Sequence, residues 1–218
     1  MDFPAESSLL IYLKTSFLFL STSVICASVC RFFKFKSTDS AGKSRRFQIR
    51  IPPPNHFFVK PDGSVTTYDK RHLFTYGGEK ERFTGGDRRV IVEWRGVRFL
   101  LLVCYDLRFP VWMRNRGDYD AILFVANWPV VRQDAWETLL KARSIENQCY
   151  VAGVNRVGKD PVCEYLGGSA LYNPFGQTVV RCKDAEMDVA TGKLSMAMLE
   201  EFRAKFPVLE DADDFILK

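Results

Sequence analysis

One thiol stands out in this sequence as a group that could do chemistry. Cys104 follows five consecutive apolar residues at positions 99–103 and is followed by a polar turn at 105–108. An apolar run of this length that ends in a polar turn predicts a buried strand that carries Cys104 at its carboxyl end. In open α/β sheets that end is where ligands bind, so Cys104 is a candidate nucleophile. The alternative is that Cys104 is simply a small buried hydrophobic residue, as many free cysteines are.

A nucleophilic thiol needs a neighbouring cation or base, and Lys70 is a candidate for the cation. Lys70 and Glu79 both fall on predicted loops, where functional residues concentrate. The alternative for each is a solvated loop side chain. The only histidines are His56 and His72, which makes a Cys-His-Asp triad or a histidine metal site difficult to assemble.

Hydrophobic periodicity predicts the elements that must position these groups. Apolar runs and alternation bounded by turn residues predict hairpins and buried strands at 57–68, 90–103, 120–127, 149–154 and 168–182. Helical spacing predicts a helix turn or two at 111–116 and helices at 132–147 and 194–206. Strands that alternate with helices indicate an α/β domain.

Charge distribution and cysteine spacing argue against a nucleic-acid-binding protein and against a disulfide-bonded secreted protein. The formal charge of +5 comes from residues 31–50, which hold seven basic residues and one acid, so no basic face for nucleic acid is indicated. Six cysteines occur without a CxxC motif or regular disulfide spacing. This usage fits a reducing compartment, and we expect a cytoplasmic protein.

The first 56 residues differ from the rest because they show no clear periodicity. Residues 9–30 are apolar and are followed by basic residues, which resembles a membrane helix with its flank. Lys14 and several serines and threonines weaken this interpretation, so we do not expect a membrane span. We therefore treat residues 1–56 as a divergent segment, either disordered or membrane-like, and residues 57–218 as the folded domain.

Seven motifs in the folded part occur in an order that resembles a known family. They are YDKRHLF at 68–74, GE at 78–79, VEWRG at 92–96, LVCYDLRFP at 102–110, DYDAILFVANWP at 118–129, ARSIENQCYVAGVNRVG at 142–158 and KFPVLEDADDF at 205–215. Together they resemble the nitrilase superfamily of carbon–nitrogen hydrolases, in its omega-amidase-like branch. The resemblance implies a four-layer αββα sandwich, here N-terminally incomplete, that forms homodimers.

The resemblance also implies a reaction and roles for individual residues. A Glu-Lys-Cys triad would hydrolyse a small terminal amide, for example 2-oxoglutaramate, and release ammonia without a metal or another cofactor. Cys104 would form a thioester, while Lys70 and the backbone N–H of Tyr105 would stabilise the oxyanion. Glu79 would support Lys70 and the substrate.

Three further residues are candidates for substrate binding. Trp128 would line the acyl pocket, or else belong to the core or an interface. Arg108 and Arg156 would contact a substrate carboxylate, or else be structural partners of Asp106 or Glu146. Asp106 itself is expected to shape the turn after Cys104.

The general base of the family is the point at which this sequence departs from the pattern. The LPE motif that carries it does not occur, and Glu6, in FPAE, is the only glutamate before Lys70. No apolar strand precedes Glu6 to hold it in reach of Cys104. Two hypotheses therefore stay open: an active amidase, or a catalytically inactive relative from a truncated gene that acts as a binding or oligomerisation module.

Overall fold

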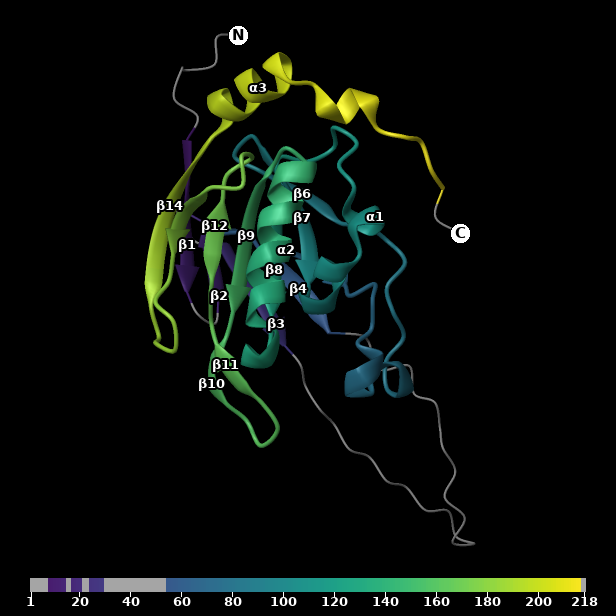
Figure 1. Ribbon diagram of the computed structural model, residues 1–218, viewed down its shortest axis with the longest axis vertical. Coiled ribbons are helices and arrows are strands. Elements are labelled where there is room, and N and C mark those ends of the chain that lie inside the picture. The colour runs from purple at the N-terminus through teal and green to yellow at the C-terminus, as the bar shows by residue number, and fades with distance from the viewer. Residues whose placement is uncertain (1–7, 15–16, 21–23, 30–53, 217–218) are drawn as a thin grey trace, which may run out of the picture.

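Two six-stranded sheets form the core of the molecule (Figure 1). The computed structural model describes the backbone of residues 8–14, 17–20 and 24–29 and the whole of residues 54–216. The sheets lie against each other, since β1, β3 and β4 of one contact β9, β8 and β7 of the other. The expected α/β class is confirmed, with a sheet in which parallel and antiparallel strands are mixed.

The first sheet is antiparallel throughout and has the order β14-β1-β2-β3-β4-β5. Its strands are β1 (Ser8–Lys14), β2 (Phe17–Leu20), β3 (Val24–Val29), β4 (Asn55–Val59), β5 (Val65–Asp69) and β14 (Val189–Ser195). The hairpin predicted over 57–68 is β4 and β5, and the boundary expected after residue 56 falls inside β4.

The comparison of residues 9–30 with a membrane helix is wrong for the described part of this stretch. It forms β1, β2 and β3, whose ladder runs from β14 to β4. The stretch is rich in β-branched and aromatic residues, which favour strands, and a short apolar run cannot be assigned to helix or strand by hydropathy alone. Within the described residues, no helix has the length and apolar character needed to cross a membrane.

The second sheet carries the predicted strand that ends at Cys104. Its order is β13-β12-β9-β8-β7-β6. The strands are β6 (Ile91–Trp94), β7 (Val97–Val103), β8 (Ala121–Ala126), β9 (Tyr150–Asn155), β12 (Ala170–Tyr172) and β13 (Thr178–Arg181). The three central strands β7, β8 and β9 are parallel, so their carboxyl ends lie at one edge. The structure also has a small hairpin that the sequence analysis did not predict, β10 (Val157–Lys159) with β11 (Glu164–Leu166).

Helix α2 (Gln133–Glu146) covers the second sheet and confirms the helix predicted over 132–147. Trp136 and Leu140 bury their side chains against β9. A Cβ at Gly153 would lie 2.5 Å from the Leu140 side chain and 2.8 Å from that of Trp136, so glycine is required for this close packing.

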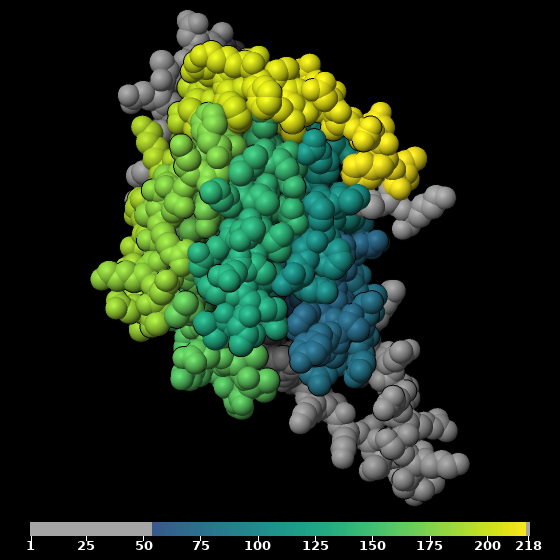
Figure 2. Space-filling view, in the orientation of Figure 1, coloured from purple at the N-terminus to yellow at the C-terminus, as the bar shows by residue number. Residues whose placement is uncertain are grey.

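Two further helices lie at the ends of the sheets. Helix α3 (Met196–Lys205) begins at Ser195, whose side chain accepts a hydrogen bond from the Met198 N–H. Its Arg203 pairs with Asp120, just before β8, so α3 lies at the end of the sheet opposite to Cys104. Figure 2 shows these C-terminal residues, in yellow, across one end of the molecule. Helix α1 (Pro110–Met113) is shorter than the predicted 111–116, because Arg114 has an extended backbone.

Candidate active site

Cys104 lies where the sequence predicts it, directly after β7 and at the start of a short 3₁₀ turn, η3 (Cys104–Arg108). Its φ angle is 46°, in the left-handed region that costs a non-glycine residue about 1–3 kcal/mol. Residue Cys104 is partly exposed, and its Sγ lies 3.9 Å from the carbonyl oxygen of Asn127, after β8. A strained backbone thus holds the Cys104 thiol at the carboxyl edge of the parallel strands.

Asp106 holds the turn that presents Cys104. Its buried carboxylate accepts hydrogen bonds from the Val103 N–H at 3.1 Å and from the Tyr68 hydroxyl at 2.8 Å. It also accepts from the N–H and the Nδ1 of His72, both at 2.9 Å. The expected role of Asp106 in shaping the turn is confirmed, and the same carboxylate ties this turn to the segment after β5.

Lys70 follows β5 directly and is 1% exposed. Its Nζ donates to both carboxylate oxygens of Glu79, at 2.9 and 2.7 Å. Glu79 begins a short turn, η2 (Glu79–Glu81), and also accepts the N–H of Phe74 at 2.8 Å. The alternative of solvated loop side chains is therefore wrong for both residues, which form one positioned pair.

Opposing effects set the pKa of the Cys104 thiol. Burial raises this pKa most, the positive charge of Lys70 lowers it, and the carboxylates of Glu79 and Asp106 raise it. The net result is a pKa above the usual thiol value, so Lys70 alone does not hold Cys104 as a thiolate at neutral pH. Chemistry at this thiol would require a group that accepts its proton.

Glu6, the candidate for that group, lies outside the described residues. Tyr105, whose backbone is the expected oxyanion donor, is the second residue of η3. Its ring packs edge-on against Phe74 and Phe109, with centroids 5.0 and 5.1 Å apart. The described residues contain no group of three or more His, Cys, Asp or Glu side chains that could hold a metal ion.

Trp128 lies one residue beyond Asn127 and is 3% exposed. Its backbone N–H donates to the Asn155 side chain at 2.7 Å, and its Nε1–H donates to the carbonyl of Arg132 at 2.7 Å. The Asn155 amide in turn donates to the Trp128 carbonyl at 2.9 Å. Asn155, the last residue of β9, therefore organises this side of the site.

The two predicted substrate arginines have different surroundings. Arg108 is exposed, and its guanidinium lies over the Trp128 ring at 5.1 Å. Arg156 lies over the Tyr165 ring at 4.5 Å, with Asp160 3.9 Å away, and so belongs to the β10–β11 hairpin. Neither arginine pairs with Asp106 or with Glu146 within the described part of the chain, so those structural alternatives are wrong; Glu146 pairs with Arg143 instead.

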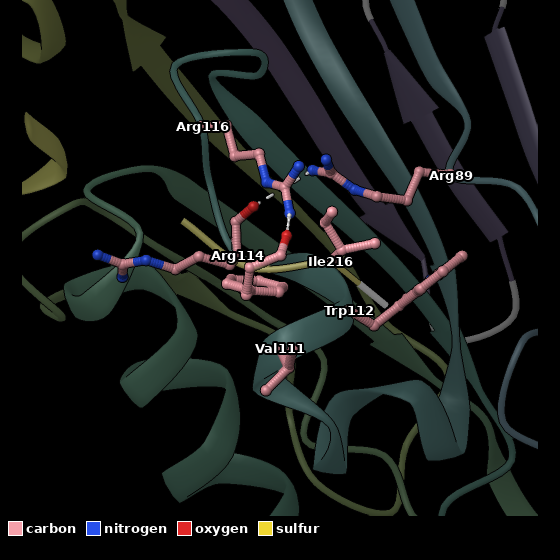
Figure 3. A pocket seen from close by; sticks show the side chains of 7 residues that line it. Arg89, Val111, Trp112, Arg114, Arg116 and Ile216 are labelled. Carbon is pink, nitrogen blue, oxygen red and sulfur yellow. Dashed lines mark hydrogen bonds between the residues drawn. The ribbon is translucent and has the colours of Figure 1, made fainter. Parts of the chain in front are cut away.

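Two of the surface pockets among the described residues lie in this half of the molecule. One, of about 410 Å³, is lined by Tyr105, His72 and Lys80 among other residues. The second, of about 220 Å³, lies between α1 and Ile216, with Arg89 and Arg116 in its wall (Figure 3). Cys104 lines neither pocket.

Comparisons with known proteins agree with this geometry. The family model of carbon-nitrogen hydrolases matches residues 54–204. The omega-amidase YafV of Escherichia coli K12 is 54% identical over 160 residues, which cover 73% of this chain and 62% of the relative. The 2-oxoglutaramate amidase of Bacillus subtilis is 36% identical over 149 residues, or 67% of this chain and 57% of the relative.

A solved structure of the same superfamily is also similar to this chain. XC1258 from Xanthomonas campestris, a CN-hydrolase superfamily protein with an arsenic adduct in its active site, has a TM-score of 0.76 and 43% identity. The match covers 89% of this chain and 71% of that one. This chain spans about three fifths of the length of the curated relatives that it matches. It belongs to the carbon–nitrogen hydrolases of the nitrilase superfamily, in the branch of the omega-amidase YafV.

Proposed function

We propose that this protein hydrolyses the terminal amide of small linear omega-amido acids, of the type of 2-oxoglutaramate, to the acid and ammonia. The observation that carries the proposal is the ion pair of the buried Lys70 with the partly exposed Glu79, whose charges act on the strained, partly exposed Cys104. The relatives named omega-amidase and 2-oxoglutaramate amidase support this choice of amide.

In the proposed reaction, Cys104 transfers its proton to a base and its sulfur attacks the amide carbon. Lys70 and the Tyr105 N–H stabilise the oxyanion, each donor contributing about 3 kcal/mol. The tetrahedral intermediate collapses, and ammonia leaves with the proton that the base returns. Water then adds to the thioester through the same base, which releases the carboxylic acid and the free thiol.

Each remaining residue has a supporting role in this proposal. Glu79 fixes the Lys70 ammonium, Trp128 lines the acyl pocket, and Arg108 contacts the carboxylate of the substrate. Glu6 is the candidate for the base. Arg156 would contact the substrate only from a greater distance, because Asp160 and Tyr165 are its neighbours.

The finer description of the molecule is part of the same proposal. It comprises the four-layer αββα sandwich, the homodimer and the cytoplasmic location. No metal or other cofactor enters the reaction. The resemblance in motif order supports the sandwich and the homodimer, and the irregular cysteine spacing supports the cytoplasmic location. Sedimentation of the purified protein tests the dimer.

A second candidate is a catalytically inactive module that binds small acids or oligomerises. The raised pKa of the Cys104 thiol favours it, because the chemistry then depends entirely on a separate base. Under this candidate the protein would fold and bind acids without forming a thioester.

Ammonia release from 2-oxoglutaramate by the purified full-length chain distinguishes the two candidates. We expect turnover and, in rapidly quenched samples, an intact-mass increase equal to the acyl group. Cys104→Ala should abolish both signals, while Cys163→Ala, a change of another partly exposed thiol, should preserve them. Absence of both turnover and adduct in the unmodified protein would refute the amidase and support the inactive module.

A further inference from the structure

Arg132 lies close to the site, like Arg108, but its sequence position alone does not mark it as a candidate residue. It ends a short turn, η4 (Val130–Arg132), that follows β8, and it is partly exposed. Its guanidinium lies 5.5 Å from the centre of the Phe74 ring. Among the described residues no carboxylate lies within 4 Å of Arg132 or Arg108. Seven other arginines each have one: Arg88, Arg89, Arg98, Arg143, Arg156, Arg181 and Arg203.

Two lines of contact connect Arg132 to Cys104. On one side, the Phe74 ring beneath the guanidinium packs against the ring of Tyr105, the residue after Cys104. On the other side, the Arg132 carbonyl accepts the Nε1–H of Trp128, next to Asn127, whose carbonyl lies 3.9 Å from the Cys104 Sγ. The Phe74 ring therefore places the guanidinium next to Tyr105, and the bond to Trp128 fixes the backbone of Arg132 next to Asn127.

The charges nearby give this guanidinium a specific use. Lys70 donates two hydrogen bonds to Glu79, and in the proposed reaction its third N–H serves the oxyanion, so it is not available for a carboxylate elsewhere on the substrate. A guanidinium that rests on an aromatic ring is held in a plane, and its N–H groups stay free for bidentate hydrogen bonds to a carboxylate. Arg108 lies over Trp128 in the same way.

We propose that Arg132 determines specificity by binding the carboxylate that lies at the far end of the substrate from the amide. Arg132 would thus select amides of dicarboxylic acids over neutral amides. This inference rests on the proposed amidase function, and it adds a residue and a means of selection to it.

The test compares an anionic amide, glutaramate, with a neutral one of similar length, valeramide, and measures the binding of glutarate by calorimetry. Arg132→Gln should weaken glutarate binding and lower kcat/KM for glutaramate by about 10- to 100-fold, the effect of losing a hydrogen bond to a charged group. The kcat/KM for valeramide should stay within about twofold, and Arg132→Lys should restore part of the loss. Arg95→Gln is the matched control, because Arg95 also lies over a ring, that of Trp94, at the other end of β7.

The possible outcomes distinguish a failure of the proposed role of Arg132 from a failure of the proposed amidase function. Hydrolysis of no amide, together with glutarate binding that Arg132→Gln removes, would refute the proposed function and leave the carboxylate-binding role of Arg132 in place. If Arg132→Gln lowers kcat/KM equally for glutaramate and valeramide, Arg132 does not determine specificity, because it would then act only through Phe74. Glutarate binding that is absent in the unmodified protein, or unchanged in Arg132→Gln, would also overturn it.

Discussion

Replacing Asp106 by Asn should strongly destabilise the protein, because four donors converge on this buried carboxylate. One oxygen accepts the backbone N–H and the Nδ1 of His72, and the other accepts the Val103 N–H and the Tyr68 hydroxyl. Burial and the charge of Asp106 raise the pKa of Tyr68 well above its usual value, so this hydroxyl stays a donor. Asn has nearly the same shape but only one acceptor oxygen.

The expected magnitude follows from counting these donors. The amide oxygen of Asn can accept two of them, while its NH₂ group faces the other two and leaves them without an acceptor. Each unsatisfied buried donor costs about 1–3 kcal/mol, so the free energy of unfolding should fall by about 4 kcal/mol. For a chain of this size, about 2–4 °C of Tm is lost per kcal/mol, which predicts a decrease of about 10 °C.

Urea and thermal unfolding, followed by circular dichroism, measure this loss. Asp87→Asn is the matched control, since Asp87 is 86% exposed and its nearest cation, Arg88, is 3.9 Å away. The control should change the free energy of unfolding by less than about 0.5 kcal/mol. A value for Asp106→Asn within 1 kcal/mol of the unmodified protein would refute the view that this carboxylate holds the turn together.

Two further predictions concern charge. Lys70→Gln should raise the pKa of the Cys104 thiol further, because the neighbouring cation is lost while the carboxylate of Glu79 remains. Since iodoacetamide reacts with the thiolate, alkylation of Cys104 at pH 8 should slow about tenfold. His56 is fully buried, and burial lowers its pKa to about 4, so the unfolded chain binds a proton between pH 6.5 and 4 that the folded protein does not. Stability should therefore fall as the pH decreases through this window, by about 3 kcal/mol from this residue, and His56→Gln should remove that part of the decrease.

Controls for these two experiments use residues of the same type. Lys80, on the same loop as Glu79, is exposed, so Lys80→Gln should leave the alkylation rate unchanged; an equal effect of both lysine variants would argue against a specific charge at Cys104. Urea titrations at pH 7 and pH 4.5 test the second prediction. If His56→Gln loses as much stability between these pH values as the unmodified protein does, His56 does not titrate as inferred.

Local sequence was sufficient for most elements and for the identity of the central groups. The run at 99–103 and the polar turn after it place Cys104 at the end of β7, because a continuous apolar run suits a strand buried on both faces. The turn residues at 60–63 and at 95–96 determine the hairpins β4–β5 and β6–β7 in the same way. These features depend on neighbours along the chain, so periodicity and turn chemistry reveal them.

The first strands could not be recognised in this way. An apolar stretch at 9–30 fits a helix or a pair of strands equally well by hydropathy. The choice depends on partners far away in sequence: β1 pairs with β14, and β3 pairs with β4. Strand pairing over such separations leaves little local signal.

The tertiary structure alone decided how the site residues are paired. The sequence places Lys70, Glu79 and Cys104 on the correct segments, yet the burial of Lys70 against Glu79 and the raised pKa of Cys104 follow from packing. The same holds for Asp106, which meets His72 across 34 positions, and for Arg132, whose ring partner lies on another loop. Composition and order thus determined which groups are available, and the fold determined which charges are neutralised and which remain free, because electrostatic energies depend on distance and burial in space.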